Sequence, residues 1–164
     1  MFVENMLNPA NEKVYSFLDQ IFTEVAQLFP GEYIHMGGDE CYQGFWEKNP
    51  EIQEFMKRNN LKDTHALQNY FVNRVDQIIS SKGKTMIGWD EILDSKLSKN
   101  AAVMSWRGMK GGIKAAKANH NVVMSPTTYC YLDYAQGDHS VENWIYASLN
   151  LKKTYDFEQT LIQI

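Results

Sequence analysis

Short apolar segments alternate with amphipathic stretches along most of this chain, and this alternation constrains its fold more than any other feature. Four segments are largely apolar on both faces, as strands of a buried parallel sheet are. These segments are residues 33–36, 85–89, 101–106 and 122–124. Helical patterns separate them, so the sequence predicts an α/β fold of about four βα units. A doubly wound sheet and a part of a (β/α)8 barrel both fit this alternation.

Four helices are predicted from apolar residues at helical spacing and from residues that begin or end helices. Pro30-Gly31 ends the first helix and Gly83 ends the third. The predicted starts are Asn8-Pro9, Asn49-Pro50, Asp63 or Thr64, and Gly111-Gly112.

Polar and aromatic residues follow each predicted strand at its carboxyl end. In a barrel all of these ends open onto one face, where active sites are built. In a doubly wound sheet, ligands gather mainly near one switch point. The sequence therefore favours a partial (β/α)8 barrel. The residues concerned are Asp39-Glu40, Trp89-Asp90-Glu91, Trp106-Arg107 and Ser125-Pro126.

Composition narrows the classes of partner. The net charge of −4 comes from mixed signs, which disfavours nucleic acid. The chain contains no run of about 18 apolar residues, so no membrane span is expected. It contains no glycine-rich phosphate loop, which disfavours a nucleotide as ligand. Aromatic residues make up 13% of the chain, which hints at a binding surface built from rings.

Residues 35–40 read His-Met-Gly-Gly-Asp-Glu, which places two carboxylates side by side directly after a predicted strand. Like charges at this distance repel, so adjacent acids are rarely placed there for stability. Acid-catalysed bond cleavage needs such a pair, because one acid must hold a proton while the other stays ionised. Taken alone, the pair would more often be a solvated acidic turn.

The His35–Glu40 segment resembles the His-x-Gly-Gly-Asp-Glu motif of the family 20 glycoside hydrolases, the β-N-acetylhexosaminidases. Three further segments resemble that family in the same order and at similar spacing. The resemblance runs from about residue 9 to about residue 158 and implies a part of the family's catalytic barrel. The three segments are Gly88–Glu91, Ser105–Gly108 and Tyr129–Tyr134.

The resemblance implies hydrolysis of terminal N-acetyl-β-hexosamine residues from glycans, with no metal and no organic cofactor. Glu40 resembles the general acid/base. Asp39 resembles the residue that accepts a hydrogen bond from the N–H of the substrate's 2-acetamido group. The acetamido oxygen is then the nucleophile. This route is an exception among retaining glycosidases, which ordinarily use two protein carboxylates.

Five further residues are expected at the sugar. Trp89 and Trp106 could form the apolar slot for the acetamido methyl, since sugar C–H groups pack on flat rings. Tyr131 could donate its hydroxyl to the acetamido oxygen, Asp133 could accept from a sugar hydroxyl, and His35 is expected to orient its neighbours.

Several nearby residues are expected to have structural roles instead. Asp90 and Glu91 form a second acid pair that we interpret as structural or as a helix cap. Arg107 is expected to form an ion pair, and Cys41 to be a small buried packing residue. A metal held by Cys41 and His35 is disfavoured, because no CxxC or HxxxH spacing is present.

We expect residues 1–164 to be a single-domain fragment of the family's barrel that lacks the N-terminal half and the final strand region. The end of the chain, residues 159–164, precedes the family's last tryptophan. Open sheet edges then predict self-association or weak activity of the chain alone. We expect the parent protein to be secreted, periplasmic or lysosomal in type.

Two other hypotheses remain open. The chain could be a non-catalytic carbohydrate-binding fragment that keeps the aromatic surface, although a pure binder does not need both Asp39 and Glu40. It could also be a purely structural domain, which predicts that Trp89, Trp106 and Tyr131 are buried apart from one another.

Overall fold

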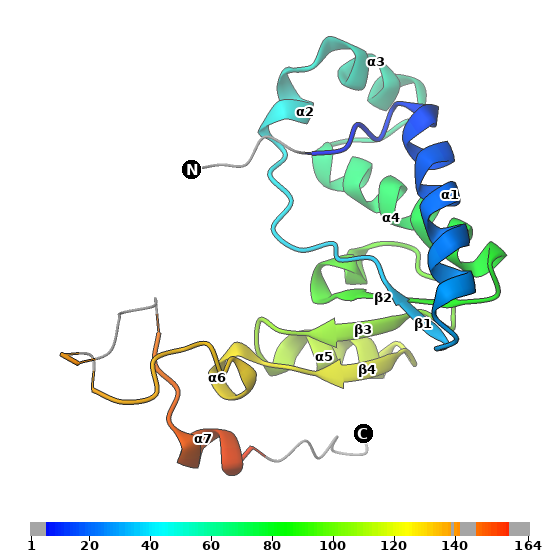
Figure 1. The fold of residues 1–164 in the computed structure, drawn as a ribbon. Helices are drawn as coiled ribbons and strands as arrows, with labels where there is room; N and C mark the ends of the chain where they lie inside the picture. The colour runs from blue at the N-terminus through cyan, green and yellow to red at the C-terminus, as the bar shows by residue number, and fades with distance from the viewer. Residues whose placement is uncertain (1–5, 139, 142–146, 158–164) are drawn as a thin grey trace.

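The computed structural model describes residues 6–138, 140–141 and 147–157. Its strands form a four-stranded sheet in the order β1-β2-β3-β4, and every neighbouring pair is parallel (Figure 1). This order follows the sequence without a reversal, as in a barrel and unlike a doubly wound sheet. The predicted α/β fold with four parallel strands is confirmed. The strands are β1 (Tyr33–His35), β2 (Thr85–Trp89), β3 (Ala102–Ser105) and β4 (Asn121–Met124).

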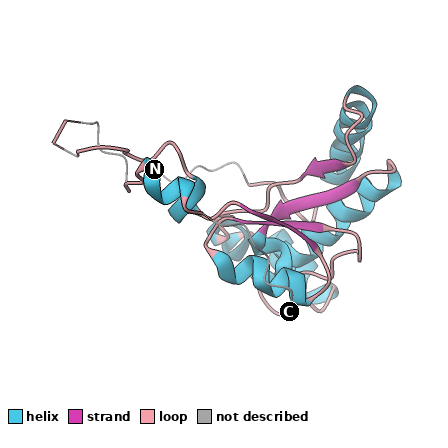
Figure 2. Cartoon of the chain, turned by 90° about the horizontal axis from the view of Figure 1, so that it is seen from below, coloured by secondary structure: helices cyan, strands magenta, loops and turns pink. Residues whose placement is uncertain are grey.

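The four predicted helices are present as α1, α3, α4 and α5 (Figures 1 and 2). The sequence did not reveal α2, α6, α7 or the 3-10 helix η1, because each has five residues or fewer and shows no helical period. The helices are α1 (Glu12–Leu28), α2 (Gly44–Lys48), α3 (Pro50–Arg58), α4 (Thr64–Ser81), η1 (Asp90–Asp94), α5 (Met109–Lys117), α6 (Thr127–Cys130) and α7 (Leu151–Tyr155).

Two predicted helix starts were wrong. Helix α1 begins at Glu12 with Asn11 as its N-cap, whereas Asn8 begins the preceding turn by accepting from the Ala10 amide at 2.9 Å. Helix α5 begins at Met109, so Gly111 lies inside it. A side chain there would meet Asp90, because a Cβ at Gly111 would lie 2.7 Å from the Asp90 Cβ. That glycine therefore serves close packing and does not begin a helix.

The two faces of the sheet differ in what covers them. Ile34, Met86 and Val103 point to one face, where they join a buried core with Val75 and Ile79 of α4. This core places α4 against the sheet, and α1 packs in turn on α4. On the opposite face the edge strands β1 and β4 leave side chains exposed, Tyr33 and Val123 among them. That face corresponds to the interior of a barrel.

A second, smaller core fixes the connection between β1 and α4. Trp46 of α2 is buried there with Ile52, Met56 and Leu67. The Trp46 indole N–H donates to the Leu7 carbonyl at 3.1 Å, which satisfies its only polar group. This cluster holds the loop that follows β1 against the rest of the molecule.

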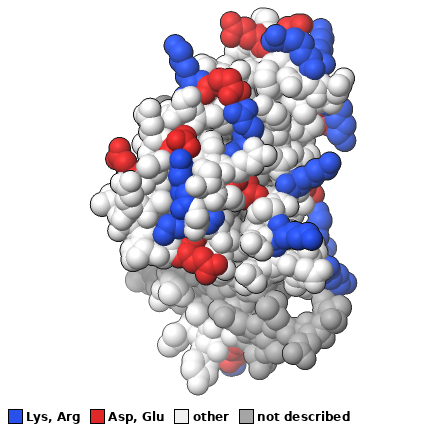
Figure 3. All heavy atoms as spheres, turned by 90° about the vertical axis from the view of Figure 1, so that its right-hand side faces the viewer, with Lys and Arg blue, Asp and Glu red and all other residues white. Residues whose placement is uncertain are grey.

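On the face shown in Figure 3, acidic and basic side chains are both present and lie among uncharged residues. None of the helices in the described parts of the chain has the length and apolarity to cross a membrane. The segment at residues 159–164, discussed above as preceding the family's last tryptophan, lies outside the described residues.

Candidate active site

The acid loop, residues 36–40, leaves the carboxyl end of β1 with an unusual backbone. Gly37 and Gly38 have φ values of 79° and 102°, which glycine adopts without strain. Glu40 has a φ of 44°, a left-handed conformation that non-glycine residues seldom adopt. Backbone strain of this kind is held by its surroundings and tends to gather at functional sites. A Cβ at Gly38 would lie 2.9 Å from Ile92 Cγ2, so the loop also needs a glycine for space.

Hydrogen bonds from two sides hold the acid loop. The Trp89 backbone N–H donates to the Gly37 carbonyl at 2.9 Å, which extends the pairing of β1 and β2. From the other side, Gln68 of α4 donates to the Gly38 carbonyl at 3.2 Å. Gln43 donates to Gln68 at 2.8 Å, and the Thr64 hydroxyl donates to Gln43 at 2.6 Å. This amide relay connects the start of α4 to the acid loop.

The acid pair opens into a cavity of about 370 Å³, and both side chains are exposed to it. Three of the predicted sugar-binding rings line the same cavity, so the hypothesis that they are buried apart is contradicted. The lining residues are Asp39, Glu40, Trp89, Trp106, Tyr131 and Tyr134. Four separate regions of the chain therefore meet here, each at or just beyond the carboxyl end of a strand.

The aromatic wall of this cavity, Trp89, Trp106, Tyr131 and Tyr134, is a continuous series of ring contacts. Trp89 and Trp106 meet edge to face with centroids 6.5 Å apart. The ring planes of Trp106 and Tyr131 are nearly parallel, with 15° between them and centroids 6.4 Å apart, and Tyr134 meets Tyr131 edge-on at 5.6 Å. Rings in such contact constrain one another, so the wall offers a preformed apolar surface.

The second acid pair anchors this wall. The Asp90 side chain is only 2% exposed and accepts hydrogen bonds from the backbone N–H groups of Trp106 and Arg107 at 3.1 and 3.3 Å. Arg107 Nε also lies 2.5 Å from Asp90 Oδ1. Glu91 accepts from the Trp106 indole N–H. These contacts agree with the structural role expected for Asp90 and Glu91 and with the ion pair expected for Arg107.

His35 does not line the cavity in the described part of the chain. It contacts Trp89, which lines the cavity; the two ring centroids lie 5.0 Å apart and the rings meet edge to face. Its Nδ1 accepts from the Gly37 N–H at 3.0 Å, and partial burial lowers the pKa of the imidazole. The predicted orienting role fits this position between the acid loop and Trp89.

Asp133 is exposed and is not among the described residues that line the cavity. Its contact with a sugar hydroxyl remains a prediction. Cys41 is half-buried beside the smaller core, and burial raises the pKa of its thiol to about 11, so it stays protonated at neutral pH. No group of three or more His, Cys, Asp or Glu side chains within the described ranges is arranged to hold a metal ion.

Sequence reasoning missed Tyr134 as a cavity residue. Its only signal was its place at the end of the segment Tyr129–Tyr134, in which three of six residues are tyrosine. Nothing in that spacing tells which ring faces the cavity, because the segment begins in the short helix α6 and is irregular from Tyr131 onward.

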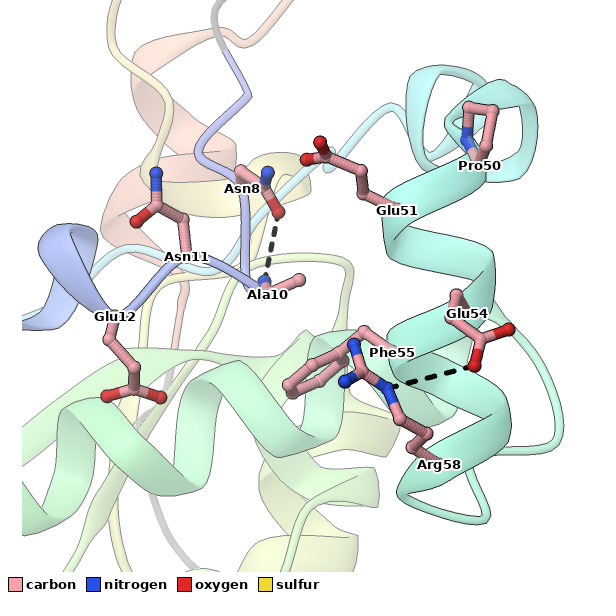
Figure 4. Close-up of a pocket in the computed structure, with 9 residues that line it drawn as sticks. All are labelled: Asn8, Ala10, Asn11, Glu12, Pro50, Glu51, Glu54, Phe55 and Arg58. Atoms are coloured by element: carbon pink, nitrogen blue, oxygen red, sulfur yellow. Dashed lines mark hydrogen bonds and ion pairs between the residues drawn. The ribbon is translucent and has the colours of Figure 1, made fainter.

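A larger cavity of about 590 Å³ lies between the start of α1 and helix α3 (Figure 4). Most of its charged side chains already have partners. Glu54 pairs with Arg58, and Glu12 accepts two hydrogen bonds from Arg74. It shares no lining residue with the cavity of the acid pair. We therefore place the candidate active site at the smaller cavity.

Parallel strands in sequence order, with acids and rings gathered at their carboxyl ends, define a segment of a (β/α)8-barrel enzyme. The chain belongs to glycoside hydrolase family 20, because the model of that family's catalytic domain matches residues 2–163. The predicted partial barrel and the resemblance to this family are thereby confirmed.

Known relatives agree with this assignment. The chain is 48% identical over 132 residues to a β-hexosaminidase of Porphyromonas gingivalis. This match covers 80% of this chain and 17% of that protein. It superposes on a chitobiase of Flavobacterium johnsoniae with a TM-score of 0.74 at 41% identity, covering 82% of this chain and 22% of the other. It also superposes on an exo-β-N-acetylglucosaminidase of Vibrio harveyi, whose structure is a complex with N-acetylglucosamine. The TM-score is 0.88 at 32% identity, and the match covers 96% of this chain and 25% of the other. The chain thus spans about a sixth to a quarter of the length of these relatives.

Proposed function

We propose that this chain supplies the acid pair and part of the sugar-binding wall of a β-N-acetylhexosaminidase, within a single barrel domain. The observation that carries the proposal is the shared cavity of Asp39, Glu40 and the aromatic wall. The substrate is the terminal N-acetylglucosamine or N-acetylgalactosamine residue of a glycan. Because the chain spans only part of its relatives, binding and turnover have to be tested separately.

The proposed reaction uses the substrate's own amide. Glu40 donates a proton to the glycosidic oxygen as the bond to the anomeric carbon breaks. Asp39 accepts a hydrogen bond from the acetamido N–H, which turns the acetamido oxygen toward the anomeric carbon. That oxygen bonds to the carbon, and Asp39 stabilises the positive charge on the resulting oxazolinium intermediate. Water then attacks the anomeric carbon as the bond from that carbon to the acetamido oxygen breaks. Glu40 takes a proton from the water, and the anomeric configuration is retained. Adjacent acids suffice, because the nucleophile belongs to the substrate.

The aromatic wall supports this chemistry by positioning. Trp89 and Trp106 present flat faces for the acetamido methyl and the C–H groups of the sugar. A rigid wall holds the acetamido oxygen near the anomeric carbon, and such proximity contributes to the rate. Tyr131 is proposed to donate its hydroxyl to the acetamido oxygen as charge develops.

The test compares Glu40→Gln with wild type in two assays. Hydrolysis of a chromogenic N-acetylglucosaminide should fall by about 10²- to 10⁴-fold, as expected for loss of a general acid. Binding of an oxazoline-mimicking inhibitor should stay within about threefold, since the wall is unchanged. Glu54→Gln, on an exposed part of α3, is the matched control. Loss of hydrolysis and binding together would contradict the proposed role of Glu40.

A non-catalytic carbohydrate-binding role is the second candidate. The aromatic wall favours it, because flat rings in mutual contact offer a surface for sugar C–H groups whether or not the acids act as catalysts. This role predicts that wild type binds the inhibitor without measurable hydrolysis. It also predicts that Asp39→Asn leaves inhibitor affinity unchanged, whereas the catalytic proposal predicts weaker binding.

Self-association through the edge strands remains a prediction. β1 and β4 are the edges of the described sheet, and Tyr33 and Val123 are exposed beside them. Analytical ultracentrifugation of the 164-residue chain should show a dimer or higher species. A monomer with family-level turnover would contradict this expectation.

A further inference from the structure

We propose that Glu91 is a positioning residue that fixes the tilt of the Trp106 indole in the sugar-binding wall. The inference rests on the proposed function, because it assigns Trp106 to the sugar. Glu91 itself does not line the cavity in the described structure. It acts through the indole N–H of Trp106.

The contact involves both carboxylate oxygens. The Trp106 indole N–H lies 3.2 Å from Oε1 and 3.0 Å from Oε2 of Glu91. A donor shared between two acceptors of one rigid group has its position restricted in the plane of the ring. The Glu91 side chain is only 15% exposed, so water competes little for this hydrogen bond.

The neighbouring residues fix the other end of Trp106. Asp90 accepts from the Trp106 backbone N–H, so the backbone and the indole of one residue are held by adjacent carboxylates. Ser105 donates to the Gly108 carbonyl and accepts from the Gly112 N–H, both at 2.8 Å, which ties the same strand end to α5. With both ends held, the ring keeps one orientation relative to Trp89 and Tyr131.

The charges around Glu91 make the contact measurable. Burial raises the pKa of the Glu91 carboxyl, while the hydrogen bond from Trp106 and the charge of Arg107, 3.5 Å away, act in the opposite direction. Asp90, on the same helix, raises it further. At the far end of η1, Asp94 pairs with Lys114 and His65. Glu91 should therefore titrate above the ordinary glutamate value of about 4.3.

The experiment follows the Trp106 indole N–H resonance of ¹⁵N-labelled protein, assigned by its loss in Trp106→Phe. In wild type this resonance should shift with pH in a step centred above about 4.3. In Glu91→Gln the step should vanish, while the indole keeps its protection from hydrogen exchange, because the amide oxygen still accepts. In Glu91→Met the protection should fall at least tenfold. Glu54→Gln should behave as wild type.

A titration with N-acetylglucosamine then tests the consequence for binding. Affinity should change by less than about threefold in Glu91→Gln and weaken by about tenfold or more in Glu91→Met. A pH step that persists in Glu91→Gln, or full protection in Glu91→Met, would overturn the proposed contact. Equal affinity in wild type and Glu91→Met would overturn the positioning role. A wild-type protein that shows the pH step but does not respond to the sugar would contradict the proposed function and leave the contact established.

Discussion

The acid loop and the aromatic wall face the same cavity but are held in place by different means. The acid loop depends on backbone geometry, with glycines at positive φ and neutral amides that bind its carbonyl groups. The wall depends on the buried Asp90 and the partly buried Glu91, whose carboxylates accept from N–H groups of Trp106 and Arg107. Charged hydrogen bonds are stronger than neutral ones, so the wall should be the more rigid of the two. A looser acid loop fits the role proposed for Glu40, which is to exchange protons with substrate and water.

The largest effect on this comparison should come from Asp90→Ala, which removes the acceptor at the base of the wall. The free energy of unfolding should fall by about 3 kcal/mol, because two backbone N–H groups lose a partner at about 1–3 kcal/mol each. Urea denaturation measures the loss. Glu54→Ala, which removes an exposed pair on α3, should cost no more than about 0.5 kcal/mol. Similar losses in the two variants would show that Asp90 does not anchor the wall.

Gly88→Ala should disturb the acid loop and the base of the wall together. A Cβ there would lie 3.0 Å from the Gly37 carbonyl oxygen and from two atoms of Ile92. We expect a loss of about 1–3 kcal/mol, as for other overpacked sites, together with faster amide exchange in residues 37–40. Gly31→Ala is the matched control, since no atom lies within 4 Å of its new Cβ. An unchanged denaturation midpoint in Gly88→Ala would contradict the close approach of these segments.

Gln68→Leu should loosen the acid loop alone. It removes the hydrogen bond to the Gly38 carbonyl and breaks the amide relay, at a cost of about 1 kcal/mol. Hydrogen exchange should quicken at Gly38, Asp39 and Glu40 and stay the same at Trp106. Gln77→Leu, at an exposed position of the same helix, should change neither. If Gln68→Leu quickens exchange at Trp106 equally, the two regions are one cooperative unit.

The smallest effect should come from acidification, acting through His35. Its pKa in the folded protein lies below the ordinary value of about 6.5, because burial disfavours the charged ring. Between the folded and unfolded pKa values, the unfolded chain therefore binds more protons than the folded protein. The contribution of His35 to the free energy of unfolding is at its full value above about pH 6.5 and falls as the pH drops below it. Urea midpoints at pH 7.5 and 5.5 should differ less in His35→Phe than in wild type. An equal difference would show that His35 does not titrate with folding.

Much of this arrangement could be predicted from local patterns. Apolar runs located the four strands, and Asn49 and Asp63 are the observed N-caps of α3 and α4. The acids and the two tryptophans were expected together, because parallel strands end at a common edge. The amide relay could not be predicted, since Gln68 and Gly38 are separated by 30 positions. Neither could the contact of Gly111 with Asp90, because a glycine pair by itself more often indicates a helix end or a turn.

The sequence by itself determined which chemical groups are present and which strand end carries each, because strand periodicity and glycine positions are local properties. It also determined the family, since four motifs occur in the right order. The tertiary structure decided which of these groups share a cavity and how each is held. It brought Tyr134 to the wall, left Asp133 exposed, and gave Glu91 the indole of Trp106 as its partner. Such pairings depend on packing between distant segments, and no local pattern specifies them.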